Sequence, residues 1–137
     1  MCANPLISSA QALPQRDGIA NLLKCAFNMD PTLAATGADR VLTPGTGTSG
    51  LPYLGLATSG SQRLRVEYIR RRNATDLLYQ VQFCSRLDAT GSPDDWAEAT
   101  APETVKPIDA EWERVVVKDQ PPAGAAARFV RVLVRRL

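Results

Sequence analysis

The side chains that commonly carry catalytic chemistry are few in this chain of 137 residues. It contains no histidine, so a Ser-His-Asp or Cys-His relay cannot form. Acid–base chemistry near neutral pH would therefore need a strongly shifted carboxylate, lysine, tyrosine or cysteine. Acidic residues late in the chain could include a carboxylate pair of the glycosidase kind; they are Asp94, Asp95, Glu98, Glu103, Asp109, Glu111 and Glu113. Acidic loops are usually solvated surface, so we expect that the protein is not an enzyme.

The cysteines give no sign of a metal site or of a disulfide framework. Cys2, Cys25 and Cys84 are an odd set with wide spacing and no CxxC motif. Because histidine is also absent, the usual zinc ligand patterns are missing. We expect no metal and no cofactor, and we expect Cys25 and Cys84 to serve as small apolar packing residues.

Charge is distributed unevenly along the chain. Residues 61–72 hold five arginines and one glutamate, residues 73–113 carry a net charge of −7, and residues 114–137 carry +5. Such segregation could serve an anionic partner or self-association between unlike faces, although solvent-facing strands also use arginine and glutamate to blunt exposed edges. The candidate binding surface consists of Arg70, Arg71, Arg72, Arg131, Arg135, Trp96 and Trp112.

The first regular element is a short amphipathic helix over about residues 18–28. Apolar residues recur there at helical spacing, and Leu22, Leu23 and Phe27 form the stripe. Asp17 is placed to cap the first amides, and Asn28 is placed to end the helix. A helix this short is marginal alone, so its stripe must pack on another element. Residues 32–50, rich in Gly, Thr and Ala, predict a surface loop before a short strand at 51–58.

The stretch from Ser61 to Leu87 predicts two long strands, because apolar and polar residues alternate with a period of two on both sides of residues 73–76. The turn-forming residues Asn73 and Asp76 lie between these strands. We expect the two strands to pair as a β-hairpin.

The rest of the chain adds shorter strands. Residues 96–100 could be a strand whose Trp96 closes one end of the core, residues 101–111 read as a loop or an edge strand, and residues 112–118 alternate cleanly. In the last strand Val130, Val132 and Val134 should face the core. We predict an antiparallel β-sandwich of about six or seven strands with one N-terminal helix, spanning residues 17–137 after an extension at 1–16.

The order of these segments resembles a known bacterial module. DGIANLLKCAFNMDP is followed by LRVEYIRRRNATDLLYQVQFCSRL, Trp96, VVVKD and RFVRVLVRRL. This order is similar to the C-terminal β-sandwich module of large secreted proteins from Verrucomicrobia-type and related bacteria. Two positions depart from that pattern, because Cys25 and Cys84 stand where Tyr and a small residue would be expected. The resemblance implies a fibronectin-type or immunoglobulin-like sandwich that is a non-catalytic, extracellular or cell-surface accessory domain.

Three kinds of partner follow from these observations. The first is protein, either a second copy or a larger host assembly that pairs with a strand edge or a charged face. The alternative is a glycan, for which Tyr53, Trp96 and Trp112 are the available aromatic platforms, although each could equally be core. Nucleic acid is a less favoured partner because no binding motif accompanies the arginines. No apolar run approaches the roughly 20 residues that span a bilayer, and the first residues lack the pattern of a secretory signal.

Overall fold

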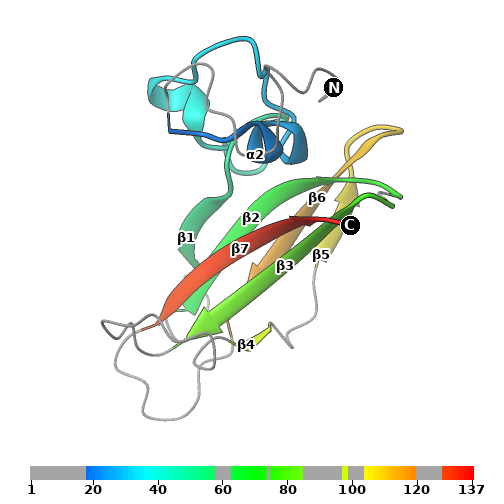
Figure 1. The fold of residues 1–137 in the computed structure, drawn as a ribbon. Helices are drawn as coiled ribbons and strands as arrows, with labels where there is room; N and C mark the ends of the chain where they lie inside the picture. The colour runs from blue at the N-terminus through cyan, green and yellow to red at the C-terminus, as the bar shows by residue number, and fades with distance from the viewer. Residues whose placement is uncertain (1–17, 58–62, 74, 85–96, 99–103, 120–127) are drawn as a thin grey trace.

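The computed structural model describes residues 18–57, 63–73, 75–84, 97–98, 104–119 and 128–137. Within these residues the chain forms two β-sheets that face each other, with a helical segment at one end (Figure 1). One sheet has four strands in the order β1-β2-β6-β5, and the other has three in the order β4-β3-β7. All paired strands are antiparallel. The predicted antiparallel β-sandwich is confirmed.

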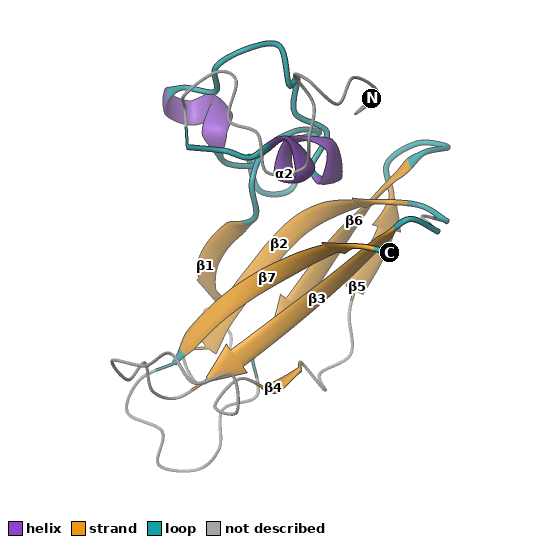
Figure 2. Ribbon diagram, viewed as in Figure 1, coloured by secondary structure: helices purple, strands orange, loops and turns teal. Residues whose placement is uncertain are grey.

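Figure 2 shows the strands of the two sheets in one colour. The four-stranded sheet contains β1 (Tyr53–Ala57), β2 (Arg63–Arg71), β6 (Trp112–Lys118) and β5 (Thr104–Pro107). The three-stranded sheet contains β4 (Ala97–Glu98), β3 (Leu77–Cys84) and β7 (Phe129–Arg136). The strand predicted at 112–118 is confirmed, and β5 is the edge strand expected within 101–111. Trp96, which was expected to close the core, lies outside the described residues.

The predicted hairpin between residues 61 and 87 is wrong. β2 pairs with β1 and β6, whereas β3 pairs with β4 and β7, so the two strands lie in opposite sheets. The chain crosses between the sheets after Asn73, which has a positive φ of 55°. Alternation shows that one face of each strand is buried, but it does not show which strand is the hydrogen-bonding partner. A hairpin and a crossing between sheets therefore have the same sequence pattern.

The main core lies between the sheets and is built from alternate residues of both. Its buried strand residues are Val66, Tyr68, Leu77, Val81, Phe83, Val115 and Val117. The predicted inward face of the last strand is confirmed, because Val130, Val132 and Val134 pack against this core. These three valines are only partly buried, which indicates that the core is less completely covered along β7 than along β2.

Helix α2 (Asn21–Ala26) is shorter than the predicted helix at 18–28. Asp17 lies outside the described residues, and the N-cap position belongs to Ala20, which makes no side-chain capping bond. The helix ends as predicted, because Asn28 adopts a left-handed φ of 56° and the Met29 N–H donates to the Lys24 carbonyl. In the described part of the chain, no helix combines the length and apolar character needed to cross a membrane.

Three aromatic rings join the helical segment to both sheets. Phe27 follows α2, Tyr68 lies in β2, and Tyr79 lies in β3. The Phe27 ring meets the Tyr68 ring edge-on at 6.5 Å and the Tyr79 ring at 6.0 Å, while the two tyrosine rings stack at 6.2 Å. The Tyr79 hydroxyl donates a 2.7 Å hydrogen bond to the Ala26 carbonyl. The apolar stripe of the helix is therefore held against the sandwich. This is the tertiary contact that a helix this short needs to be stable.

The segment predicted as a surface loop at 32–50 includes a short 3-10 helix, η1 (Gly37–Arg40), and also packs on the sheet. Leu42 is buried in a second apolar cluster with Ile69 and Trp112, on the outer face of the four-stranded sheet. The Gly50 N–H donates to the Phe27 carbonyl at 3.2 Å and connects this segment to the helix. One side of the sheet thus packs in the core, and part of the other side is covered by residues 41–50.

The expectation that Cys25 serves as a small apolar packing residue is wrong. The Cys25 sulfur is disulfide-bonded, whereas Cys84 is a buried thiol outside any disulfide. Spacing along the chain excludes known motifs, but it does not report which sulfur atoms approach each other after folding. Cys84 has the packing role that was expected for it.

Replacing Phe27 tests whether the aromatic junction holds the fold. Phe27→Ala removes two ring contacts and leaves a cavity, so we expect the free energy of unfolding to fall by about 3–5 kcal/mol. Urea denaturation followed by tryptophan fluorescence measures this change. Leu33, which is 62% exposed, is the control, and Leu33→Ala should change stability by less than about 0.5 kcal/mol. Equal effects of the two substitutions would contradict the packing described here.

Candidate functional site

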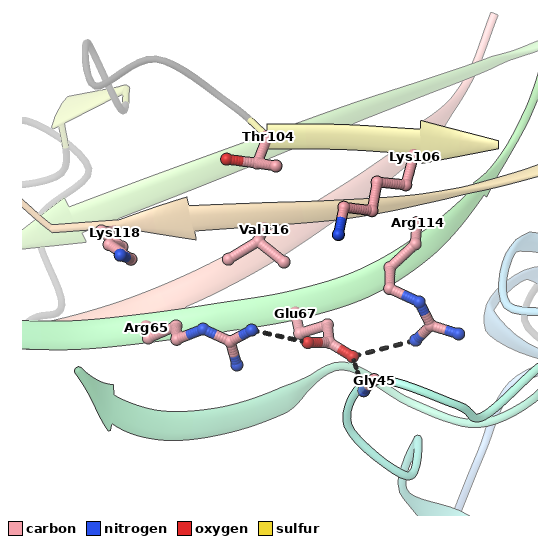
Figure 3. A pocket seen from close by; sticks show the side chains of 8 residues that line it. All are labelled: Gly45, Arg65, Glu67, Thr104, Lys106, Arg114, Val116 and Lys118. Carbon is pink, nitrogen blue, oxygen red and sulfur yellow. Dashed lines mark hydrogen bonds and ion pairs between the residues drawn. The ribbon is translucent and has the colours of Figure 1, made fainter. Parts of the chain in front are cut away.

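A basic pocket of about 310 Å³ lies on the outer face of the four-stranded sheet (Figure 3). Three strands and one loop supply its walls, because outward-facing residues of β2, β6 and β5 stand side by side in the register of the sheet. The lining residues are Gly45, Arg65, Glu67, Thr104, Lys106, Arg114, Val116 and Lys118. Four of the eight carry a positive charge and one carries a negative charge.

The carboxylate of Glu67 is buried in this pocket, with 1% of its side chain exposed. Its Oε1 accepts a 2.8 Å hydrogen bond from Arg65 Nη2, and its Oε2 accepts one of 2.9 Å from Arg114 Nη1. The backbone N–H of Gly45 donates to the same Oε2 at 2.5 Å. Both oxygens are therefore engaged, and the carboxylate joins two strands to the loop.

These contacts set the protonation of Glu67. Burial acts to raise the pKa of Glu67, but the hydrogen bonds from Gly45, Arg65 and Arg114 and the charge of Arg65 outweigh burial, and the pKa is lowered. Glu67 thus stays ionised and cannot act as a general base near neutral pH. Its negative charge is paired with both arginines and offsets part of their positive charge. The role of Glu67 is to position Arg65, Arg114 and the loop at Gly45.

The two lysines of the pocket carry the remaining charge. Lys106 projects from β5 and Lys118 from the end of β6, and both side chains are exposed. Neither ammonium group is paired with a carboxylate among the described residues that line the pocket. In Figure 3 the Lys106 side chain extends from β5 across the neighbouring strand, and Thr104 presents its hydroxyl on the same edge strand. With Arg65 and Arg114 nearby, this arrangement favours an anionic group.

The residues predicted as a binding surface are distributed over two sheets. Arg70 pairs with Glu113 at 2.9 Å, Arg71 lies 3.9 Å from Asp76, and Arg72 donates to the Asp109 carbonyl. These arginines lie at the end of β2 in the four-stranded sheet.

The other predicted residues lie elsewhere. Arg131 and Arg135 belong to β7 in the three-stranded sheet, where the Arg131 Nε donates to the Gln82 side chain at 2.9 Å. Trp112 is 9% exposed and packs in the second apolar cluster, so it offers no exposed platform for a sugar. Tyr53 is partly buried beside it. Trp96 lies outside the described residues.

Sequence reasoning missed the pocket itself. Arg65 and Glu67 in β2 and Arg114 and Lys118 in β6 belong to segments that were predicted as alternating strands. Lys106 in β5 belongs to the segment that was predicted as a loop or an edge strand. The available signal was that charged residues recur at even spacing, as strand residues on one face must. Bringing them together requires the register of three strands, for example Glu67 opposite Val116 and Lys106 opposite Arg114. One sequence does not contain that register.

No group of histidine, cysteine or carboxylate side chains in the described part of the chain is arranged to hold a metal ion. No protein-family model, curated protein or solved structure matches the chain. What this site does therefore has to be argued from its own side chains.

A pH-dependent stability measurement tests the role of Glu67. Because the pKa of Glu67 is lowered in the folded protein, its contribution is fully present above the unfolded pKa of about 4.3 and is lost as pH falls through the lower folded value. Glu67→Gln should therefore lower the free energy of unfolding by about 3 kcal/mol at pH 7. The difference from the parent protein should shrink below about pH 4.

Urea denaturation at pH 7, 5 and 3 measures this difference, expressed relative to the parent protein so that other carboxylates cancel. Glu111→Gln is the matched control because the Glu111 side chain is exposed, and it should have little effect at any pH. A Glu67→Gln difference that is as large at pH 3 as at pH 7 would show that Glu67 is not an ionised partner of the two arginines.

Proposed function

We propose that this chain is a non-catalytic interaction module that docks onto a larger cell-surface or extracellular assembly through its basic pocket. The observation that carries the proposal is the placement of Lys106 and Lys118 beside Arg65 and Arg114, with a single carboxylate among them. Glu67 offsets part of the charge of the arginines, so the pocket keeps a positive potential at the surface. The partner is an acidic segment of another protein, whose carboxylates reach the two lysines.

The composition of the pocket favours binding over catalysis. Its single carboxylate is held ionised by three donors, and its hydroxyl, on Thr104, has no base beside it among the lining residues. Nucleophilic catalysis would need such a base within hydrogen-bond reach. The lining also contains no aromatic ring on which a sugar could stack, so a protein partner is favoured over the glycan alternative.

The order of strands supports an immunoglobulin-like identity for the module. An immunoglobulin constant-type sandwich sets strands A-B-E-D against C-F-G. Here β1-β2-β6-β5 corresponds to A-B-E-D when the strands are read in chain order, and the neighbours β3 and β7 correspond to C and F. This correspondence agrees with the resemblance to exported bacterial β-sandwich modules, for which a docking role is the natural expectation.

The disulfide at Cys25 supports an extracellular or cell-surface location. Disulfides persist in oxidising compartments and are rare in the reducing cytosol. A small interaction module that is exported would gain stability from such a crosslink. The proposed location and the proposed docking role thus rest on separate observations.

Binding to an acidic probe tests the docking role. A fluorescein-labelled hexaglutamate peptide should bind at low ionic strength and be released by salt, as expected for exposed charges. Replacing both lysines, Lys106→Ala with Lys118→Ala, should weaken binding by about tenfold or more, which corresponds to about 1.4 kcal/mol. Fluorescence anisotropy measures the dissociation constant.

The matched control removes two positive charges from the other sheet. Arg135 and Arg136 are exposed in β7, and Arg135→Ala with Arg136→Ala should leave the affinity nearly unchanged. If this control weakened binding as much as the lysine substitutions did, the attraction would come from net charge and the pocket would have no special role.

Thiol alkylation tests the disulfide. A bond at Cys25 occupies two of the three cysteines and leaves Cys84 as the one thiol outside a disulfide. We expect the denatured protein to take up one alkyl group without reductant and three after reduction, as measured by intact-mass spectrometry. Protein purified under non-reducing conditions from an oxidising compartment is required. Uptake of three groups without reductant would remove the support for an extracellular location.

A further inference from the structure

We propose a second interaction surface: the side of the sandwich formed by β1 and β7 accepts a single β-strand from another protein. The first observation concerns Leu54 and Leu56 in β1. They stand opposite Val66 and Leu64 of β2 in the antiparallel register, and directly opposed residues share one face of a sheet. Val66 is a core residue and Leu64 packs against the core, so both leucines project from the inner face.

These inward-facing leucines are nevertheless exposed. Leu54 is 52% exposed and Leu56 is 57% exposed, whereas Val66 on the same face is 2% exposed. A leucine that projects from the inner face of a sandwich is normally covered by the opposite sheet. No strand in the described part of the chain covers these two. On the side of β1, the four-stranded sheet is therefore wider than the three-stranded sheet that packs on its inner face.

The second observation is the outer edge of β7. The Leu137 N–H donates to the Asp76 carbonyl at 2.9 Å, which continues the ladder with β3 in which Leu77 stands opposite Arg136. Backbone groups of an antiparallel strand point alternately to its two sides. Odd-numbered residues of β7 therefore bond to β3, and the N–H and C=O groups of Val130 and Val132 point toward the opposite edge. β7 has no second partner strand among the described residues.

The edge of β7 carries arginines, but in length and in the absence of proline it is less protected than the far edge of the other sheet. At the far edge of the other sheet, β5 has four residues and carries Lys106 and Pro107, and short strands, lysine and proline discourage further pairing. β7 is twice as long, with eight residues and no proline. A long regular edge beside exposed leucines is the arrangement that β-strand addition uses.

The space fits one strand. Figure 1 shows β1 and β7 toward the same side of the sandwich, and β7 lies close to β2 in the opposite sheet. Because β1 continues its sheet one strand beyond β2, the four-stranded sheet extends past β7 by about the 4.8 Å spacing of one strand. A single strand bonded to β7 would lie opposite β1 and cover Leu54 and Leu56. This is the position of strand G in the immunoglobulin arrangement.

A whole second copy does not fit the same place. In each copy β7 packs against β2 of the opposite sheet, and β1 extends that sheet one strand further. If the β7 strands of two copies paired edge to edge, β1 of one copy would therefore occupy the same space as β2 of the other copy. A separate extended segment avoids this overlap. Helix α2 packs near β7, so the segment need only match the length of β1, which has five residues.

The surface defines the chemistry of its partner. Residues of the incoming strand that face inward meet Leu54, Leu56 and the valines of β7, so they should be apolar at alternate positions. An intervening residue lies beside Arg131 on the outer face of β7, where an acidic side chain forms a favourable cross-strand pair. The partner is therefore an extended segment of another protein in which apolar and acidic residues alternate.

Hydrogen exchange in the full chain tests the proposal with a synthetic peptide of about seven residues that alternates valine and glutamate between terminal threonines. Adding the peptide should slow exchange of the Val130 and Val132 amides by about tenfold or more. The Arg131 amide, which points toward β3, should change little. A peptide of the same composition with a central proline should have no effect, because proline cannot donate to the ladder.

Variants separate this surface from nonspecific binding. Leu54→Ser with Leu56→Ser, and separately Val132→Pro, should each weaken peptide binding by about tenfold or more. Leu33→Ser changes another exposed leucine and should leave binding unchanged. The lysine substitutions in the basic pocket should also leave it unchanged, so this test is independent of the docking role proposed above.

Two outcomes would overturn the proposal. The first is absence of any protection of the Val130 and Val132 amides at saturating peptide, which would mean that this edge does not accept a strand. The second is self-association without peptide that Leu54→Ser with Leu56→Ser abolishes in light scattering, which would identify a second copy as the occupant. Circular dichroism of each variant confirms that folding is retained before binding is compared.

Discussion

The contact among Phe27, Tyr68 and Tyr79 is the interaction on which the rest of the structure depends. Tyr68 belongs to one sheet and Tyr79 to the other, so their stacked rings fix how the sheets face each other at this end. Phe27 contacts both rings and thereby anchors the helical segment to the two sheets. The Gly50 N–H bonds to the Phe27 carbonyl, which places the following loop over the outer face, where Gly45 reaches Glu67.

Sequence periodicity predicted the buried faces of β2, β3 and β7 but not which strands are their neighbours. The inward positions of β7 and the apolar stripe ending in Phe27 could be read directly, because burial repeats with the geometry of the element. The pairing of β2 and β3 could not, because residues 72–76 are compatible both with a turn and with a crossing between sheets. Hydrogen-bond partners in a sheet depend on contacts between distant segments, and alternation contains no information on those contacts.

The basic pocket could not be predicted for a related reason. Glu67 has the sequence context of a solvated strand residue, yet it is 1% exposed because Gly45 and residues around it lie over the sheet. The covering segment is rich in glycine and threonine and has no periodicity that would place it. A buried carboxylate needs partners, and these come from Arg65, two residues away, and Arg114, which is distant in sequence. Two of the three partners of the carboxylate, Arg114 and the Gly45 N–H, therefore depend on tertiary structure.

The core is covered to different degrees, and this difference explains how the sandwich can be folded while one side stays uncovered. The aromatic junction covers the core beside the helical segment with rings that are among the most buried in the chain, such as Phe27 and Tyr68. Along the side formed by β1, Leu54 and Leu56 leave apolar surface in water. A strand bound there would remove that surface from water and stabilise the folded state by mass action. Because the aromatic junction already fixes the sheets, the proposed strand could bind and leave without unfolding the domain.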